Sequence, residues 1–332
     1  MIRAAIIGCG DVSVIHHEAL AAMDDAELVA VCDPDPQRLT SAAQRSGVPG
    51  FADLSSLLDA VGPDVVHICT PHNRHASLAI ECLQRGVNVI VEKPLAHTVD
   101  AGQQLIEAAD RSTAKVGVCF QNRYNTTSQT MHALLTSGDL GQVLGAAFTV
   151  LWHRSADYYR SRPWRGTWEG GGGGLLMNQA IHTVDLMQWL MGDVTSVSGH
   201  TSTRLLGDTI EVEDTAELVA EHASGARSVF YATLAHAANS PVTIDVVTER
   251  ATLTLRGDLT VSYADGRTEV VKERKAASGG RAYWGVSHEL LIRDFYARLD
   301  EDEPFWISPE EAHKSLRIVQ EIYTLSLPRG RH

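Results

Sequence analysis

The sequence predicts a chain of two parts. Residues 1–121 are expected to form an α/β domain with a doubly wound parallel sheet, and residues 122–332 an α+β domain with a large, mostly antiparallel, open-faced sheet. In the first part, short apolar runs alternate with amphipathic stretches, as strand–helix repeats do. Near residue 122 that alternation ends, and strand-like runs separated by turn residues follow. The length of 332 residues also favours two domains over one.

The apolar runs of the first part are the candidate strands. Several are apolar throughout, which is typical of strands covered on both faces; they are residues 3–7, 28–32, 65–69, 88–91 and 116–120. The amphipathic stretches between them predict helices at residues 14–23, 36–46, 74–85 and 99–111. Such alternation implies parallel strands joined by right-handed crossovers.

The second part has a different order of elements. We expect a helix at residues 128–135, a strand at 144–152, a loop at 158–174 and a helix at 175–190. Residues 196–271 contain successive strand-like runs with turn signals such as Asp265-Gly266. Two helices, at residues 288–299 and 309–325, are expected to close the chain, and the last of them can pack back on the first domain.

The acidic composition disfavours negatively charged partners. With 41 acidic and 28 basic residues the formal net charge is -13, which would be repelled by nucleic acid and by an anionic membrane. Apolar runs are shorter than the roughly 18 residues of a spanning helix, and the chain opens on a strand pattern instead of a signal peptide. Five cysteines without a CxxC pair indicate reduced thiols, so we expect a soluble cytoplasmic protein.

A dinucleotide signature lies where the first strand ends. Glycines at positions 8 and 10 permit a tight turn and a close approach of backbone amides to a pyrophosphate, and Ser13 replaces the usual third glycine. Asp33 follows Gly10 by 23 residues, where a carboxylate would hold ribose hydroxyls. A carboxylate there favours NAD, whereas the nearby Arg38 leaves NADP open.

Further motifs follow in order along the chain: Thr70-Pro71-His72-Asn73-Arg74-His75, Glu92-Lys93-Pro94 after a strand, Gln121-Asn122-Arg123-Tyr124, Trp164-Arg165-Gly166-Thr167-Trp168, and GGGGLLMNQAIHTVD at residues 171–185. Together with the glycine turn, they resemble the Gfo/Idh/MocA oxidoreductase family of glucose–fructose oxidoreductases, inositol dehydrogenases and sugar dehydrogenases. The resemblance covers essentially the whole chain.

The resemblance implies NAD(P) bound across a Rossmann domain, with a substrate above the nicotinamide and against the second sheet. It implies that Lys93 is a catalytic and substrate-orienting group and that His182 is an acid/base. The residues expected to bind the cofactor are Gly8, Gly10, Asp11, Val12, Asp33, Pro34, Arg38, Thr70, Pro71, Asn73, His75, Glu92 and Lys93.

The residues around position 182 suit hydride transfer between a secondary alcohol and nicotinamide. Such a reaction needs a group that takes the hydroxyl proton, and an imidazole titrates near pH 6.5. On an α-helix Asn178 and Asp185 would share a face with His182, so we expect Asn178 to fix the substrate hydroxyl and Asp185 to orient the ring. Many inositol-type members have Asp where this chain has Asn178; an amide cannot act as a base.

The expected substrate residues are Arg123, Tyr124, Trp164, Arg165, Asn178 and His182. Aromatic and polar groups match the apolar faces and hydroxyl edges of a sugar. Arg123 and Arg165 could also bind a carboxylate or phosphate on the substrate, an alternative that stays open. The His16-His17 pair and the His72/His75 spacing come without the further ligands of a closed metal site, so no metal is expected.

The sequence therefore predicts an NAD(P)-dependent dehydrogenase, or the reverse ketoreductase, acting on a sugar, sugar acid or inositol. Two alternatives stay open: an enzyme that uses tightly bound NAD as a redox relay in glycoside cleavage or epimerisation, and a nucleotide-sensing regulator without catalysis. Retention of both Lys93 and His182 counts against the regulator. The expected partner is a small carbohydrate or polyol, and the open sheet face implies a homodimer or homotetramer.

Overall fold

The computed structural model describes residues 1–274 and 287–326. Contacts divide these residues into two compact units, and each is described here by itself. The first comprises Met1–Gln121 together with the chain from helix α10 to His313; the second runs from Asn122 to the end of the first described range and resumes at Lys314.

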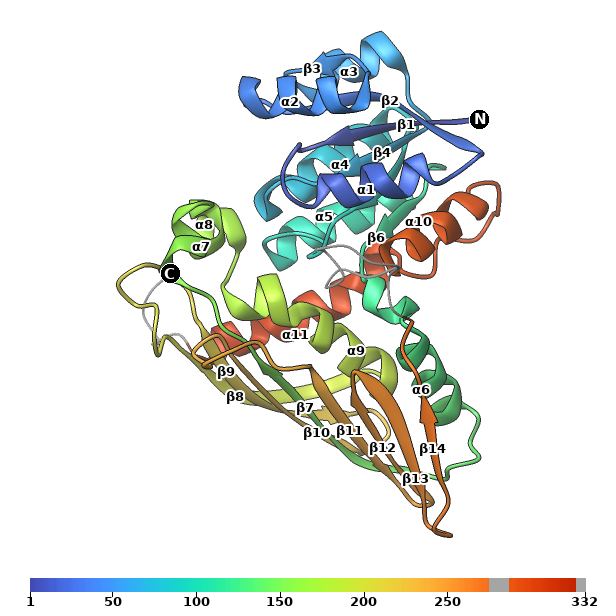
Figure 1. The fold of residues 1–332 in the computed structure, drawn as a ribbon, viewed down its shortest axis with the longest axis vertical. Coiled ribbons are helices and arrows are strands. Elements are labelled where there is room, and N and C mark those ends of the chain that lie inside the picture. The colour runs from blue at the N-terminus through green and yellow to red at the C-terminus, as the bar shows by residue number, and fades with distance from the viewer. Residues whose placement is uncertain (275–286, 327–332) are drawn as a thin grey trace. The chain divides into compact units, whose positions relative to one another are not determined.

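The first unit contains a six-stranded parallel sheet with the order β3-β2-β1-β4-β5-β6 (Figure 1). The strands are β1 (Ile2–Ile7), β2 (Ala26–Cys32), β3 (Gly50–Phe51), β4 (Val65–Ile68), β5 (Asn88–Val91) and β6 (Val116–Val118). Strand order reverses between β1 and β4, and in such a Rossmann sheet a ligand binds beyond the carboxyl ends of the strands at that point. The predicted doubly wound sheet is confirmed.

Helices connect these strands: α1 (Ser13–Ala21), α2 (Pro36–Ser46), α3 (Leu54–Val61), α4 (His75–Gln84) and α5 (Val99–Asp110). The sequence pattern left β3 and α3 unassigned, because a strand of two residues is too short to show a period. Helix α10 (Ser287–Ala297) packs against α1, although the sequence placed it in the second domain. Its Phe295 contacts the backbone of β6 at Gly117, where a Cβ would lie 2.7 Å from the ring.

The second unit contains an eight-stranded sheet with the order β14-β13-β12-β11-β7-β10-β9-β8. Its strands are β7 (Val143–Leu151), β8 (Val194–Ser202), β9 (Thr215–His222), β10 (Arg227–Thr233), β11 (Thr243–Thr248), β12 (Ala251–Arg256), β13 (Asp258–Tyr263) and β14 (Thr268–Val271). Among these described strands β7 and β10 pair in parallel, and the other neighbours are antiparallel. The mostly antiparallel sheet predicted from the turn signals is confirmed.

One face of this sheet is covered by helices and the other is open. Helices α6 (Thr126–Thr136), α9 (Ile181–Met191) and α11 (Pro309–Ser326) lie along one face, and no helix of the described residues lies on the other (Figure 1). Strand β10 shows the consequence, since Phe230 is buried while its neighbours Val229 and Tyr231 are exposed. The period of two thus separates a core face from an outer face that is still partly apolar.

The stretch expected as a loop at residues 158–174 contains short helices, α7 (Ala156–Arg160) and α8 (Trp168–Gly171), with a 3₁₀ turn at Pro163–Gly166 between them. The single helix expected at residues 175–190 is divided into a π-helical turn, Leu176–Ala180, and α9. No described helix is long and apolar enough to cross a membrane. All five cysteines are free thiols, and Cys9 is the partly exposed one.

Replacing Gly174 tests how closely the chain approaches itself before the π-helical turn. A Cβ at Gly174 would lie 2.0 Å from the carbonyl oxygen of Glu213, so Gly174→Ala should lower the free energy of unfolding by about 3 kcal/mol or more through overpacking. Urea unfolding followed by circular dichroism measures this. The control is Gly207→Ala, whose new methyl would meet nothing closer than 3.9 Å. Equal stability of the two variants would contradict the close packing.

Candidate active site

The glycine turn after β1 has the shape that a dinucleotide site needs. Gly8 has a φ of +88°, and a Cβ there would lie 2.6 Å from the carbonyl carbon of Cys69, so only glycine fits. A Cβ at Gly10 would meet nothing within 4 Å, which leaves an open cradle before α1. Ser13 donates its hydroxyl to the carbonyl of Gly10 at 2.7 Å and so closes the turn.

Asp33 is attached to this turn. Its carboxylate accepts hydrogen bonds from the backbone N–H of Cys9 at 2.8 Å and of Asp35 at 2.8 Å, and the residue is 5% exposed. Each carboxylate oxygen has a further lone pair with which it can accept a ribose hydroxyl. Arg38 lies in the first turn of α2, where its Nε is 3.6 Å from Asp35, and it is partly exposed. The residues present therefore fit an adenosine ribose at the end of β2.

The ends of β4 and β5 form the next part of the site. The Thr70 hydroxyl is buried without a hydrogen-bond partner among the described residues, as expected of a group that a ligand would satisfy. The ring of His75 lies 2.9 Å from the carbonyl of Thr70 and 2.8 Å from that of Pro94. Burial lowers the pKa of His75, so a neutral ring with one N–H donates to one of these carbonyls at a time. His75 therefore links the two loops that carry Pro71 and Lys93.

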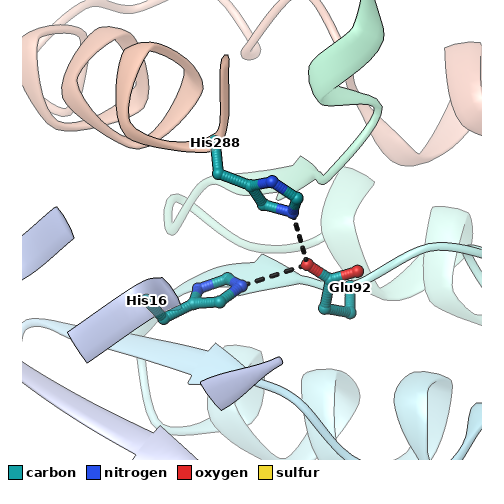
Figure 2. A group of neighbouring side chains, drawn as sticks. All are labelled: His16, Glu92 and His288. Carbon is teal, nitrogen blue, oxygen red and sulfur yellow. Dashed lines mark hydrogen bonds and ion pairs between the residues drawn. The ribbon is translucent and has the colours of Figure 1, made fainter. Parts of the chain in front are cut away.

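Directly before Lys93, the carboxylate of Glu92 is held by two histidines (Figure 2). Nε2 of His16, from α1, is 3.1 Å from Oε1 of Glu92, and Nε2 of His288, from α10, is 3.2 Å from the same oxygen. All three residues are buried. These hydrogen bonds keep the pKa of Glu92 well below its ordinary value, against the opposing effect of burial.

The anion at Glu92 determines the proton positions of a longer buried chain. Because His16 donates through Nε2, its Nδ1 accepts from Nδ1 of His67 at 2.8 Å. Nε2 of His67 in turn accepts from the hydroxyl of Tyr296 at 2.8 Å. Burial lowers the pKa of both His16 and His67, which agrees with neutral rings. Of this chain, the sequence drew attention to Glu92 and His16, and it missed His67, His288 and Tyr296, whose contacts span up to 229 residues.

His16, Glu92 and His288 are also the described residues with the geometry of a metal-ligand group, their donor atoms lying within 4.8 Å of one another. Hydrogen bonding accounts for them without an ion, because both N–H groups already point at one carboxylate oxygen. We therefore interpret the group as an anion site for Glu92 itself.

In the second unit, Arg123 and Asp185 form a buried ion pair. The guanidinium donates to both carboxylate oxygens, at 2.8 and 2.7 Å, and both side chains are 1% exposed. Asp185 also accepts from the hydroxyl of Ser315 at 3.1 Å. Arg123 therefore neutralises a buried carboxylate. Its expected contact with a substrate, and the expected orientation of His182 by Asp185, stay predictions.

Two of the remaining predicted residues of this unit, Asn178 and Arg165, lie beside Tyr158. Its hydroxyl accepts from the side-chain amides of Asn178 at 3.3 Å and Gln179 at 3.2 Å, and the guanidinium of Arg165 lies 4.5 Å from its ring centre. The half-buried His182 lies in the first turn of α9. A π-helical turn bonds i to i+5, so the spacing of four from Asn178 to His182 does not stack them as an α-helix would. Tyr124 and Trp164 are half-buried.

The predicted cofactor residues described above lie around one edge of the first sheet. In the second unit, Asn178 lies beside Tyr158. Lys93 belongs to the first unit and His182 to the second. Their meeting over a nicotinamide ring therefore stays a prediction.

Each part of the chain matches a known protein family. Residues 2–120 match the model of an oxidoreductase family with an NAD-binding Rossmann fold, GFO_IDH_MocA, and residues 128–254 match the C-terminal domain model of the same family. The chain is 31% identical to D-apiose dehydrogenase from Paraburkholderia graminis over 68% of its own length and 59% of that protein. It is 30% identical to inositol 2-dehydrogenase 2 from Saccharopolyspora erythraea over 66% of its length and 63% of that protein.

A solved structure matches over a longer span. The WlbA dehydrogenase from Bordetella pertussis, in complex with NADH and UDP-GlcNAcA, shares 31% identity and a TM-score of 0.85, with 98% of this chain and 99% of that chain covered. By contrast, the matches span about three fifths of the length of the curated relatives named above.

Acid should destabilise the protein through the buried histidines. Because burial lowers the pKa of His16 and His67, the unfolded chain binds more protons than the folded one below about pH 6.5, and stability falls as pH falls. Each such ring contributes up to about 1.4 kcal/mol per pH unit. Urea unfolding between pH 6.5 and 5 should give a shallower slope for His67→Leu than for wild type, whatever its absolute stability. The exposed His153→Gln serves as the control; a common slope for all three proteins would contradict the neutral buried chain.

Proposed function

Because the chain belongs to the Gfo/Idh/MocA oxidoreductase family, whose first domain is an NAD-binding Rossmann domain, we propose that it is an NAD-dependent dehydrogenase. It would transfer a hydride between nicotinamide and a secondary alcohol or ketone of a sugar, sugar acid or inositol. The observation that carries this proposal is the open cradle at Gly10, with Asp33 bound to the glycine turn and the unsatisfied Thr70 hydroxyl at the same sheet edge. Bound NAD would supply the hydride acceptor, and the carboxylate of Asp33 favours it over NADP.

Lys93 is proposed to orient the substrate. It follows β5 at the carboxyl edge of the sheet, the side on which ligands of this fold bind. From there an ammonium can donate to the substrate oxygen and stabilise negative charge as it develops.

His182 is proposed as the group that holds or releases the hydroxyl proton, with Asn178 positioning the hydroxyl. The Tyr158 hydroxyl accepts from two amides, so its own O–H is available to donate to an oxygen acceptor. That donor lies beside Asn178, which makes Tyr158 a further substrate contact in this proposal.

We propose an anionic sugar as the substrate class. The guanidinium groups of Arg165 and Arg154 lie 4.5 and 5.4 Å from the centre of the Tyr158 ring, in a chain whose formal net charge is -13. Two cations beside one hydroxyl donor suit a carboxylate or phosphate. The WlbA dehydrogenase, with 31% identity to this chain, was solved with UDP-GlcNAcA, a molecule that carries both.

The test is a screen of sugars, inositols, uronic acids and nucleotide-linked uronic acids with free NAD or NADP, following reduced nicotinamide by absorbance. We expect turnover with NAD and a preference for the acid over the matching neutral sugar. NADH that copurifies and does not exchange would instead support the redox-relay alternative. Binding of NADH with no turnover of any sugar would support the regulator and contradict the proposal.

Three variants separate the proposed roles. Lys93→Ala and His182→Gln should each reduce kcat by about 100-fold or more while NADH still binds, because they remove groups that act on the reacting oxygen. Arg165→Gln should raise KM for the acid without raising it for the neutral sugar. Initial rates and NADH fluorescence titrations measure both, with the exposed Arg160→Gln as the control. Wild-type turnover in Lys93→Ala would remove Lys93 from the mechanism.

We also propose that the open sheet face pairs with a second copy of the chain. The exposed Val219 and Val229 are register partners on β9 and β10, and Tyr231 and Val247 extend the apolar surface. A hollow of about 400 Å³ lies over these strands, lined in part by Thr149 and Ser198. A contiguous apolar area on an outer face is typical of an interface between subunits.

Light scattering after size exclusion should therefore report a dimer or tetramer for wild type and a smaller species for Val229→Lys, since a charge at the centre of the face opposes its burial. Leu205→Lys is the matched control, because Leu205 is 55% exposed and lies outside the strands. A monomeric wild-type protein would contradict this part of the proposal.

A further inference from the structure

Glu213, a residue to which sequence reasoning assigned no role, is a buried carboxylate beneath the glycine run. It precedes β9 and is 3% exposed. Its carboxylate accepts three hydrogen bonds: from the N–H of Gly174 at 2.9 Å, from the N–H of Leu176 at 2.8 Å, and from the hydroxyl of Tyr323 at 2.8 Å. Its own carbonyl accepts from the N–H of Leu175 at 3.1 Å. All these residues belong to the second unit.

Glycines at positions 173 and 174 allow the chain to pack closely against Tyr323 and Glu213. A Cβ at Gly174 would lie 2.0 Å from the carbonyl oxygen of Glu213, and one at Gly173 would lie 2.2 Å from the hydroxyl of Tyr323. Gly173 also has a φ of +153°, which L side chains rarely adopt. A larger residue at either position would push the chain away from Glu213.

The segment held in this way leads directly into the site. The N–H of Asn178 donates to the carbonyl of Gly174 at 3.0 Å, so the π-helical turn is bonded to a residue that Glu213 holds. Helix α9 continues from that turn and carries His182. A negative charge at the start of a helix also interacts favourably with its N-terminal amides. π-helical turns are rare and occur mostly as single turns, frequently at functional sites.

We propose that Glu213 is the positioning residue of the second unit: by holding Gly174, Leu176 and Tyr323, its carboxylate sets the π-helical turn from which Asn178 and His182 reach the substrate. This inference rests on the proposed dehydrogenase function. Glu213 touches neither substrate nor cofactor in it and acts through the backbone.

The protonation state of Glu213 then controls the site. The ionised carboxylate is a strong acceptor for all three donors, whereas in the protonated acid the oxygen that carries the O–H is a weaker acceptor for its donor. Burial raises the pKa of Glu213 to about 7. Its titratable neighbours are Tyr323 from α11 and Tyr159 from α7, and burial raises the pKa of both, so they stay neutral in this range. The adjacent carboxylate of Asp214 accepts from the backbone of Arg204, Leu205 and Leu206.

Two measurements test the inference on the full-length protein. The first is the pH titration of the Gly174 and Leu176 amide resonances by ¹⁵N NMR, which needs no substrate. The second is the pH profile of kcat/KM for the best substrate of the screen. The variants are Glu213→Gln and Tyr323→Phe, and the control is the exposed Glu211→Gln two residues away.

In wild type the amides should titrate with a midpoint near 7, and kcat/KM should fall on the acid side with the same midpoint. In Glu213→Gln the amide titration should disappear, the fall of kcat/KM with that midpoint should be lost, and kcat above pH 7 should decrease roughly ten- to hundredfold while NADH affinity is unchanged. In Tyr323→Phe the amide resonances and kcat/KM should still titrate, but with a higher midpoint. The reason is that this variant removes a hydrogen-bond donor to the ionised carboxylate of Glu213. Glu211→Gln should behave as wild type.

An active Glu213→Gln whose pH profile equals that of wild type would overturn the positioning role and leave the dehydrogenase proposal standing. Amides in wild type that do not titrate between pH 5.5 and 8.5 would overturn the control by protonation. A wild-type protein without turnover on any sugar would overturn the proposed function, and this inference with it.

Discussion

Removing a carboxylate from water is unfavourable unless protein donors replace the lost hydration, and this structure meets that condition in the interior of each unit. In the first unit, Glu92 receives imidazole N–H groups from α1 and α10. In the second, Glu213 receives two backbone amides and a tyrosine hydroxyl. Each anion joins elements that are far apart in the sequence, so the positions of those elements depend on its charge. Glu92 directly precedes Lys93 in the chain, and Glu213 holds the segment that leads to Asn178 and His182.

In the first unit, several residues expected to touch a cofactor are engaged with the protein itself. Asp33 accepts the amide of Cys9, and the ring of His75 lies between the carbonyls of Thr70 and Pro94. These bonds shape the loops at the carboxyl edge of the sheet before any ligand arrives. A site preorganised in this way loses less conformational entropy on binding. The unsatisfied hydroxyl of Thr70 and the open cradle at Gly10 are the positions where a ligand would complete the structure.

In the second unit, the arginines named as candidate site residues differ in burial. The Arg123–Asp185 pair is buried and neutralises itself, which makes it a structural feature. Arg154 and Arg165 instead lie over the half-exposed Tyr158 ring. The sequence alone could not distinguish these arginines, because burial depends on neighbours that are distant along the chain.

The sequence by itself determined the order and type of the main elements, since apolar periodicity and glycine turns are local properties. Alternating apolar runs predicted the parallel sheet, and turn signals predicted the antiparallel one. The motifs at Gly8, Gly10 and Glu92-Lys93 indicated the family. Only the tertiary structure decided that α10 joins the first unit, that His67 and Tyr296 extend the chain of hydrogen bonds to Glu92, and that Glu213 reaches the glycine run. Those contacts join residues dozens to hundreds of positions apart, and no local pattern records which distant polar groups will share the donors and acceptors that burial makes necessary.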